Sequence, residues 1–389
     1  MTKLIDITGK ALSGEWGTDD ETGKGIPVLR TTNFTNEGVV NYNDVVTRTI
    51  TKKNIADKFL RKGDIIIEKS GGSDKFPVGR VIYFNGEEKT YLFNNFTGLL
   101  RVKNQDNWYP KYVFYSLYAN YKRGGTRAFE NKTTGLHNLK TDDYVSRYEV
   151  AEIDTSKQIL ICEKLDKLYE IIKLRRQELQ LLDELIKARF VEMFGDPVSN
   201  SYALPEATLP ELGEFGRGVS KHRPRNDPKL LGGKYPLIQT GDVANARLYV
   251  TSYSSTYSKL GLEQSKMWDK GTLCITIAAN IAKTAILGFD ACFPDSVVGF
   301  NANEKTSNIF IHYWFSFFQA ILEAQAPESA QKNINLKILS ELKVIVPEKE
   351  KQDAFVKFIN QVDKSKVAIQ AALDKSQLLF DSLMQKYFG

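Results

Sequence analysis

The sequence has few of the residues on which metal sites, disulfide scaffolds and acid–base catalysis depend. Only three of its 389 residues are cysteine and three are histidine. The cysteines, Cys162, Cys274 and Cys292, are far apart, form no CxxC pair and would leave one thiol unpaired, so a disulfide framework and a zinc site are both unexpected. The histidines share no metal-ligand spacing and leave little material for proton transfer.

Long hydrophobic runs are also missing. No window approaches the roughly 20 consecutive apolar residues that span a bilayer, and the N-terminal MTKLIDITGK lacks the apolar run of a signal peptide. With 42% apolar and 26% charged residues, the composition is that of a globular protein, which we expect in the cytoplasm. The formal charge of +6 is compatible with a polyanionic partner, but it is too mild to identify one.

The common catalytic and nucleotide-binding motifs are absent as well. The stretch GTDDETGKG (17–25) resembles a phosphate-binding loop, but five residues instead of four precede its Gly-Lys, and Gly25 replaces the Ser or Thr that binds magnesium. No strand opens into GxGxxG, no Asn-Pro-Pro-aromatic run is present, and Asp64, Glu68 and Lys69 do not form the carboxylate-x-Lys triplet of nucleases. We therefore predict a binding protein with no catalytic residue, no metal and no cofactor bound by this chain.

What the sequence does contain is a repeat of itself. Phe194-Gly195 and Phe388-Gly389 are 194 positions apart, and so are Lys157-Gln158 and Lys351-Gln352. Before each Phe-Gly, mostly apolar residues recur with alternating spacings of three and four, which is typical of long helices that pack along one another. The positions of this seam are Leu165, Leu168, Ile172, Arg175, Leu179, Leu182, Ile186, Arg189 and Met193 in the first copy, and Ile359, Val362, Lys366, Ile369, Leu373, Ser376, Phe380, Leu383 and Tyr387 in the second.

Local signals limit both helices. Residues 154–156 are good N-caps for the first helix, and Pro347 suits the first turn of the second. Gly195 can take the left-handed position that ends a helix, and Asp196-Pro197 blocks its continuation. Because neither amphipathic helix is expected to stand alone in water, we predict that the two pair as an antiparallel coiled coil. The polar seam residues are either tolerated at the ends or set the register.

A weaker repeat precedes each helix. GIPVLRTTNF (25–34) aligns with KYPLIQTGDV (234–243), and KGDIIIEKSGG (62–72) aligns with KGTLCITIAAN (270–280), as strands that leave into polar loops. The aromatic stretches 108–118 and 309–322 are predicted to be buried helices, and LHNLKTDD (136–143) is aligned with NINLKILS (333–340). The predicted domains are residues 1–152 and 198–346, each of mixed α/β structure, and the predicted helical segments are residues 153–197 and 347–389.

In this order of features the chain resembles the specificity (S) subunit of type I restriction-modification enzymes. The resemblance covers essentially the whole chain and rests on the proline-entered strands at 27 and 236, the Lys-Gly strands at 62 and 270, and the Gln-initiated helices at 158 and 352 that end in Phe-Gly. It departs from the pattern in the second unit, where ANIAKTAILG (279–288) aligns with GGSDKFPVGR (71–80) but no Arg follows its glycine.

The resemblance implies an α/β fold with two target-recognition domains in pseudo-two-fold repeat, separated by two long helices that form the antiparallel coiled coil. It implies a non-catalytic subunit that reads a bipartite, asymmetric target in double-stranded DNA, one half-site per domain. Two methyltransferase subunits would dock on it and supply S-adenosylmethionine chemistry. Motor-nuclease subunits would add cleavage that uses ATP and magnesium.

Recognition of DNA needs cations and amides at loop positions between the repeated strands. The predicted DNA-binding residues of the first unit are Arg30, Thr31, Thr32, Asn33, Lys69, Ser70, Lys75, Arg123, Arg127, Lys132, Thr133 and His137. Those of the second unit are Lys221, Arg223, Arg225, Gln239, Thr240, Asp242, Asn280, Lys283, Lys332 and Asn333. For any single member an ordinary solvated surface is the competing interpretation.

Two other functions are compatible with the chain. In the first, the protein is a scaffold or adaptor that uses the coiled coil as its interface and binds proteins or glycans through its globular parts. In the second, it is a self-sufficient nuclease or methyltransferase, which the missing motifs disfavour. Steep salt dependence and sequence selectivity of DNA binding separate the specificity subunit from the scaffold.

Overall fold

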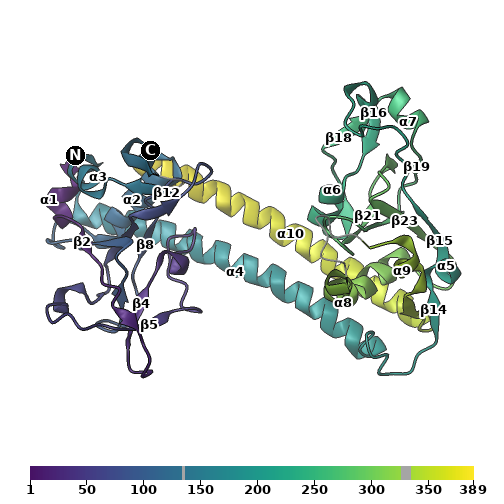
Figure 1. Ribbon diagram of the computed structural model, residues 1–389, viewed down its shortest axis with the longest axis horizontal. Helices are drawn as coiled ribbons and strands as arrows, with labels where there is room; N and C mark the ends of the chain where they lie inside the picture. The colour runs from purple at the N-terminus through teal and green to yellow at the C-terminus, as the bar shows by residue number, and fades with distance from the viewer. Residues whose placement is uncertain (134–135, 326–333) are drawn as a thin grey trace. The chain divides into compact units, whose positions relative to one another are not determined.

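The computed structural model describes residues 1–133, 136–325 and 334–389. Its contacts divide the chain into two compact units (Figure 1). The first unit contains residues 1–176 and 371–389, and the second contains residues 177–370. Each unit therefore holds one globular part together with one end of each of two long helices, and each is described by itself below.

The first unit is built around a four-stranded antiparallel sheet. In pairing order its strands are β2 (Leu12–Ser13), β10 (Thr97–Leu100), β6 (Ile65–Glu68) and β8 (Val81–Tyr83). All four residues of β6 are buried, and Ile66 packs with Leu99 in the core. A run of β-branched residues after a Lys-Gly turn therefore does form the central strand that it predicts.

Three further sheets, of four, three and two strands, and three helices complete the first unit. The proline-entered strand β4 (Ile26–Leu29) lies between β5 (Val46–Thr49) and β9 (Leu92–Phe93), and pairs with β9 in parallel. The remaining strands are β3 (Thr18–Asp19), β7 (Ser70–Gly72), β11 (Glu130–Thr133), β12 (Leu136–Leu139), β1 (Thr2–Lys3) and β13 (Glu149–Val150). The helices are α1 (Leu4–Thr8), α2 (Pro110–Lys122) and α3 (Thr141–Arg147), with short 3-10 turns at Thr31–Asn33, Ala56–Lys58 and Gly125–Phe129.

The second unit repeats this plan with a five-stranded sheet. Its order is β15 (Gly213–Arg217), β23 (Val297–Ala302), β20 (Leu273–Thr276), β21 (Thr284–Leu287) and β17 (Tyr249–Val250). The other strands are β18 (Ser255–Tyr257), β16 (Leu231–Leu237), β22 (Ala291–Cys292), β19 (Met267–Trp268), β14 (Glu206–Thr208) and β24 (Lys343–Ile345). Its helices are α5 (Leu209–Leu212), α6 (Thr240–Asn245), α7 (Lys259–Glu263), α8 (Asn308–Gln325) and α9 (Leu336–Glu341), with a 3-10 turn at Pro228–Leu230.

The internal repeat is visible in these element orders. The central pair β6–β8 corresponds to β20–β21, and the aromatic helix α2 corresponds to α8, as the sequence predicts. One alignment was wrong, because the shared Asn-Leu-Lys falls on different elements. Residues 138–139 end strand β12, whereas Asn335 is the N-cap of α9 and accepts a hydrogen bond from the backbone of Ile338 (2.9 Å).

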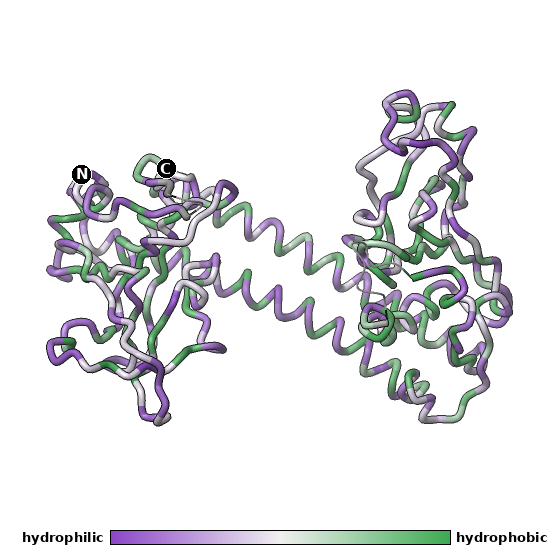
Figure 2. The backbone as a smooth tube through the Cα atoms, viewed as in Figure 1, coloured by the Kyte–Doolittle hydropathy of each residue, from purple (hydrophilic) through white to green (hydrophobic). Residues whose placement is uncertain are grey.

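The two long helices are α4 (Thr155–Phe194) and α10 (Lys349–Phe388), each of 40 residues. Hydrophobic and hydrophilic residues alternate along both (Figure 2). The first unit joins the beginning of α4 to the end of α10, and the second joins the end of α4 to the beginning of α10. Within each unit the two helices therefore run antiparallel.

Polar residues of the seam bond across the helix pair. In the first unit the Arg175 guanidinium donates to the Ser376 hydroxyl and to the carbonyl of Ala372. In the second unit the Lys366 ammonium pairs with Asp183. Of the two roles left open by the sequence, these contacts favour setting the register, since a shift of either helix would leave buried polar groups unpaired. Arg189 differs, because it pairs with Glu192 of its own helix (2.7 Å).

The glutamine of the repeated Lys-Gln dipeptide anchors each long helix to its globular part. Gln158 is 0% exposed; its side chain accepts from the backbone of Tyr109 (2.8 Å) and donates to the carbonyls of Asn107 (2.9 Å) and Ile153 (2.8 Å). Gln352 is equally buried and makes an equivalent set of bonds with residues 305, 306 and 347. The glutamine amide thus satisfies backbone groups of a loop and of the helix entrance at once.

The Phe-Gly endings dock each helix into the unit that it reaches last. Phe194 is buried in the second unit against Phe310 of α8 and Phe355 of α10, at ring-centroid distances of 5.3 and 5.6 Å. Phe388 lies in the first unit against Tyr112 of α2, at 5.1 Å. Gly195 has φ +76°, the left-handed conformation expected of a C-terminal glycine. Each globular part is therefore completed by the end of the other repeat's helix.

We predict that replacing either glutamine by alanine weakens the joint between helix and globular part. Gln158→Ala leaves the backbone donor of Tyr109 without its partner, and we expect the free energy of unfolding to fall by about 1–3 kcal/mol. Gln352→Ala is expected to have the same effect on the second unit. Urea unfolding followed by circular dichroism measures both.

Gln180→Ala on α4 is the control, since Gln180 bonds only to Glu184 of its own helix (2.9 Å) and is exposed. It should change the unfolding free energy by about 0.5 kcal/mol or less. Equal effects at all three positions would contradict the anchoring role of the two buried glutamines.

Candidate nucleic-acid interface

The first candidate loop follows β4. Arg30 pairs with Asp44 (2.9 Å), Thr31 is half-buried and Thr32 is exposed. Asn33 is 1% exposed; its side chain accepts from the backbone of Arg30 (2.8 Å) and donates to the carbonyls of Asn41 (3.0 Å) and Asp44 (2.9 Å). The side-chain groups of Asn33 thus hold the loop, which disfavours a direct contact with DNA; its DNA-binding role stays a prediction.

Arg80 fastens this loop to the central sheet. Its guanidinium donates to the carbonyls of Phe34 and Thr31 (2.9 Å each) and to Glu68 (3.3 Å). Burial raises the pKa of Glu68 above its usual range, against the lowering effect of Arg80. Arg80 ends the motif GGSDKFPVGR (71–80), but the sequence alone does not predict this role for it. The role of Arg80 could have been inferred from its position next to a buried strand, since a cation at such a place needs a partner.

The strand register also corrects the alignment of the second unit. The backbone of Glu68 bonds to Arg80 (2.8 Å), and in the second unit the backbone of Thr276 bonds to Lys283 (2.9 Å). Lys283 is therefore the structural counterpart of Arg80. The sequence alignment missed it because the loop between these strands is five residues shorter in the second unit, 277–282 against 69–79.

The glycine loop at residues 69–79 packs on the β11–β12 hairpin. Lys69 donates to the Ser13 hydroxyl (2.9 Å), and burial lowers the pKa of this lysine. Ser70 begins β7, and Lys75 is exposed at the loop's outer part. Gly72 permits the close approach, because a Cβ there would lie 2.5 Å from the backbone nitrogen of Val78.

Two residues that are predicted to contact DNA, His137 and Arg127, hold this loop in place. His137 is 5% exposed and its Nδ1 lies 2.9 Å from Glu130, whose other oxygen accepts from the backbone of Val78 (2.9 Å). His137 is therefore a buried support of the loop in this structure, which disfavours a direct contact with DNA; its DNA-binding role stays a prediction. Arg127 is exposed but donates to the carbonyls of Asp74 (3.2 Å) and Lys75 (3.3 Å). Those bonds leave part of its guanidinium for a phosphate.

The other residues between 123 and 137 that are predicted to contact DNA lie on different elements. The Arg123 guanidinium donates to the carbonyl of Phe388, which places it at the end of α10. Lys132 and Thr133 belong to β11, where they pair with His137 and Leu136 of β12. The backbone thus brings both onto the same hairpin as His137.

In the second unit the densest basic segment lies between β15 and β16. Lys221, Arg223 and Arg225 are all exposed. Arg223 pairs with Asp295 (3.2 Å), and Arg225 pairs with the same carboxylate. Asp295 precedes β23, so the cluster links the basic segment to the central sheet and holds two guanidinium groups side by side.

The residues after β16 begin a helix instead of an open loop. Asp242 accepts from the backbone of Gln239 (2.7 Å), and the Gln239 side chain accepts in return, which forms a capping box at the start of α6. Asp242 therefore caps a helix, and its negative charge disfavours a phosphate contact; its DNA-binding role stays a prediction. Gln239 is exposed and Thr240 half-buried.

The short loop of the second unit is tightly wound. Ala279 and Ala282 have φ values of +62° and +55°, which non-glycine residues rarely adopt. The Thr276 hydroxyl bonds to the backbone of Asn280 and Lys283, and Lys283 also donates to Gln319 of α8 (3.2 Å). Lys332 and Asn333, the last two predicted contacts, lie outside the described residues.

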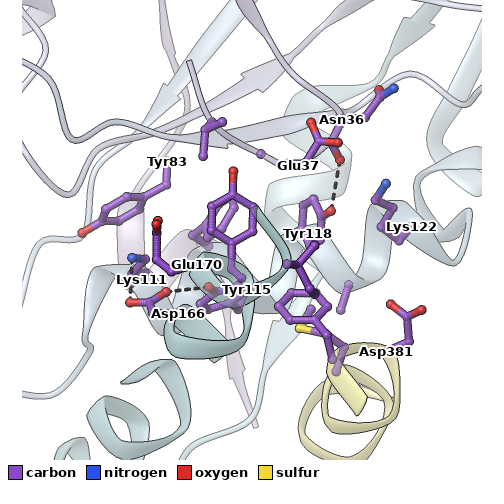
Figure 3. A pocket seen from close by; sticks show the side chains of 18 of the residues that line it. Asn36, Glu37, Tyr83, Lys111, Tyr115, Tyr118, Lys122, Asp166, Glu170 and Asp381 are labelled. Carbon is purple, nitrogen blue, oxygen red and sulfur yellow. Dashed lines mark hydrogen bonds and ion pairs between the residues drawn. The ribbon is translucent and has the colours of Figure 1, made fainter. Parts of the chain in front are cut away.

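The first unit also contains a cavity of about 980 Å³, between α2, the beginning of α4, the end of α10 and the segment 36–42 (Figure 3). Asp166 of α4 accepts from Lys111 (2.7 Å) and from the Tyr115 hydroxyl (2.6 Å) of α2. Burial raises the pKa of Tyr115, and the Tyr118 hydroxyl donates to the carbonyl of Asn36 (3.0 Å). Of the predicted DNA contacts, Arg123 alone lines this cavity, so it lies apart from the candidate loops.

The described residues offer little for other chemistry. Among them no group of three or more His, Cys, Asp or Glu side chains is arranged to hold a metal ion. The three cysteines are buried, and burial raises the pKa of each thiol. Burial also lowers the pKa of His312 to about 4, so its imidazole is neutral at pH 7. In the part of the chain that was searched, no helix is both long and apolar enough to cross a membrane.

The repeated α/β parts, each with polar loops at strand ends, and the two long helices are the architecture with which known proteins can be compared. Residues 206–377 match the family described as the type I restriction modification DNA specificity domain. This part of the chain carries such a domain, and the family is associated with sequence specificity for DNA, not with catalysis.

Similar proteins cover nearly all of the chain. A protein of Methanocaldococcus jannaschii assigned as the MjaX type I restriction enzyme specificity subunit is 20% identical over 376 residues, which are 93% of this chain and 86% of the relative. The crystal structure of the type I S subunit from M. genitalium covers 100% of this chain and 95% of its own, with a TM-score of 0.60 and 16% identity.

A further structure comes from work on complex assembly and conformational transition of a type I restriction-modification system. It covers 100% of this chain and 96% of its own, with a TM-score of 0.56 and 14% identity. The predicted resemblance to type I specificity subunits is confirmed by these comparisons together. The predicted fold, of mixed α/β parts and two long helices that pack together, is confirmed as well.

We predict that Asp295→Asn strengthens DNA binding. The amide removes the carboxylate that holds Arg223 and Arg225 and that repels phosphate, so both guanidinium groups become available. Fluorescence anisotropy with a non-specific duplex, measured between about 50 and 200 mM salt, should give a several-fold higher affinity at low salt and a steeper salt dependence.

Asp269→Asn is the matched control, since it removes the same charge from an exposed position of the same unit without releasing an arginine. It should leave the salt slope unchanged. Unchanged or weaker binding by Asp295→Asn would remove Arg223 and Arg225 from the set of phosphate contacts.

Proposed function

We propose that the protein is the DNA-specificity subunit of a type I restriction-modification system and reads a bipartite, asymmetric target. Each globular part reads one half-site through the loops at the ends of its central strands. The observation that carries this proposal is the repeat itself, in which two parts of one topology present different loops. Divergent readers of one fold suit two half-sites that differ in sequence.

The long helices suit the role of a spacer between the half-sites. A helix of 40 residues is about 60 Å long at 1.5 Å per residue, which corresponds to about 18 base pairs at 3.4 Å each. A paired helix is stiffer than a loop, which suits a connection between two readers, as dimer geometry sets half-site spacing in other DNA-binding proteins.

The proposed partners are two methyltransferase subunits, with motor-nuclease subunits as further members of the complex. The methyltransferase would bind S-adenosylmethionine and the motor-nuclease ATP and magnesium, whereas this chain would contribute no catalytic group. Support for docking comes from large apolar side chains that α4 leaves exposed, among them Leu174 and Leu181, which are about 60% exposed. These residues are seven positions apart and so lie on one face of the helix, as the docking of a partner helix requires.

The cavity of the first unit is a second candidate for partner contact. It combines tyrosine rings with both signs of charge, and it lies beside the helix ends instead of the candidate DNA loops. Aromatic and charged groups in a concavity are typical of protein interfaces, so a side chain of the methyltransferase is its proposed occupant.

The proposal predicts the result of a domain exchange. Replacing residues 198–345 by the corresponding part of another specificity subunit, while α4 and most of α10 are kept, should change one half-site of the methylated sequence and leave the other intact. Sequencing that detects methylated adenine, after co-expression with the methyltransferase, reads both half-sites. Exchange of residues 1–152 is the reciprocal control, and an unchanged target after both exchanges would contradict the proposal.

Docking is tested separately from DNA reading. Leu174→Glu and Leu181→Glu together should reduce association with the methyltransferase by at least about tenfold, since two charges would be buried at the contact. Size-exclusion chromatography with light scattering measures the stoichiometry. Gln180→Glu on the same helix is the control, and the folded state of all variants is expected to be preserved because these positions are exposed. Complete assembly by the double variant would place the interface elsewhere.

A further inference from the structure

Phe76 is an exposed aromatic ring on the longer of the two candidate loops. Phe76 is 58% exposed, whereas most phenylalanines of the described residues are buried. The neighbouring Lys75 places its ammonium 5.4 Å from the ring centroid. A single exposed ring on a protein surface needs no functional explanation by itself. Here, however, several hydrogen bonds hold the loop that carries the ring.

A hydrogen-bonded turn holds Phe76 at the tip of the loop. The backbone of Ser73 donates to the carbonyl of Phe76 (2.7 Å), and the backbone of Phe76 donates to the Ser73 hydroxyl (3.1 Å). Pro77 follows and restricts the backbone further. The ring is thus presented by a defined turn and not by an open chain.

Side chains from the hairpin side hold the same turn from outside the loop. Arg127 donates to the carbonyls of Asp74 and Lys75, and His137 lies 3.6 Å from the Asp74 carboxylate. Two buried side chains, those of His137 and Glu130, thus contact and hold a loop whose tip is exposed to solvent. Such support lowers the entropy that binding would otherwise cost, which is the usual reason to build a loop in this way.

We propose that Phe76 is a specificity-determining residue that contacts bases in the half-site read by the first unit. This rests on the proposed function of the chain. In the major groove of a duplex an apolar ring can contact the methyl group of thymine, and this contact does not compete with water for hydrogen bonds. Lys75 and Arg127 lie beside it and supply the cations that adjacent phosphates require.

The second unit has no equivalent of this tip. Its loop at residues 277–282 is short, Ile281 in it is buried, and the left-handed alanines Ala279 and Ala282 turn it back toward the sheet. The two units therefore read DNA by different means at this position. At this loop position an apolar base contact is therefore proposed for the first unit, and not for the described loop 277–282 of the second unit.

The test compares Phe76→Ala, Phe76→Leu and Lys75→Ala in the complete complex with its methyltransferase, on a library of duplexes in which both half-sites are randomised. Phe76→Ala should relax discrimination at one or two neighbouring positions of a single half-site by about 5- to 150-fold. Phe76→Leu should retain most of the discrimination, since it keeps an apolar side chain. Lys75→Ala should weaken binding to all sequences alike and reduce the salt slope by about one.

The outcomes separate this inference from the proposed function. A wild-type complex that shows no sequence preference overturns both. A selective wild-type complex whose target is unchanged by Phe76→Ala overturns the role of Phe76 and leaves the proposed function intact. Relaxation in both half-sites, or uniform weakening by Phe76→Ala without relaxation, shows a structural or electrostatic role and also overturns it. Thermal unfolding of each variant verifies that the folded fraction is the same.

Discussion

Neither of the two long helices could keep its apolar seam in water, and the rest of the structure depends on their packing against each other. The seam alone would tolerate shifts by a heptad, because leucine and isoleucine recur at each step. Arg175 with Ser376, and Lys366 with Asp183, remove that freedom, since each pair is satisfied in one register only. A few buried polar contacts therefore decide which residues of the two repeats meet.

The joints between helix and globular part use the same chemistry twice. Gln158 bonds to three backbone groups, and Gln352 bonds to two backbone carbonyls and to the Thr306 hydroxyl, groups that would otherwise be buried without these partners. Globular parts with different surfaces can then be joined in an equivalent way to the beginnings of α4 and α10. This separation explains how the two globular parts can differ in their loops while their connections to the helices stay alike.

The large features of the fold could be predicted from the sequence because each has a periodic or local signal. The heptad seam, the buried isoleucine strand and the glycine that ends α4 belong to this group. The roles of Asn33, His137 and Asp242 could not be predicted, because amides, imidazoles and carboxylates suit DNA contacts, loop supports and helix caps equally well. Burial decides between these roles, and burial comes from the tertiary structure. Lys283 was misaligned for a related reason, since a loop of different length hides the strand register.

Phe388 packs on α2, and the first unit is complete only when residues 371–389 have joined it. During synthesis these residues leave the ribosome after every residue of the second unit, which occupies 177–370. The part of the protein that is made first is therefore the part that is finished last. Until then the contact between Phe388 and Tyr112 of α2 cannot form. The first unit therefore cannot be completed before the whole second unit has been synthesised.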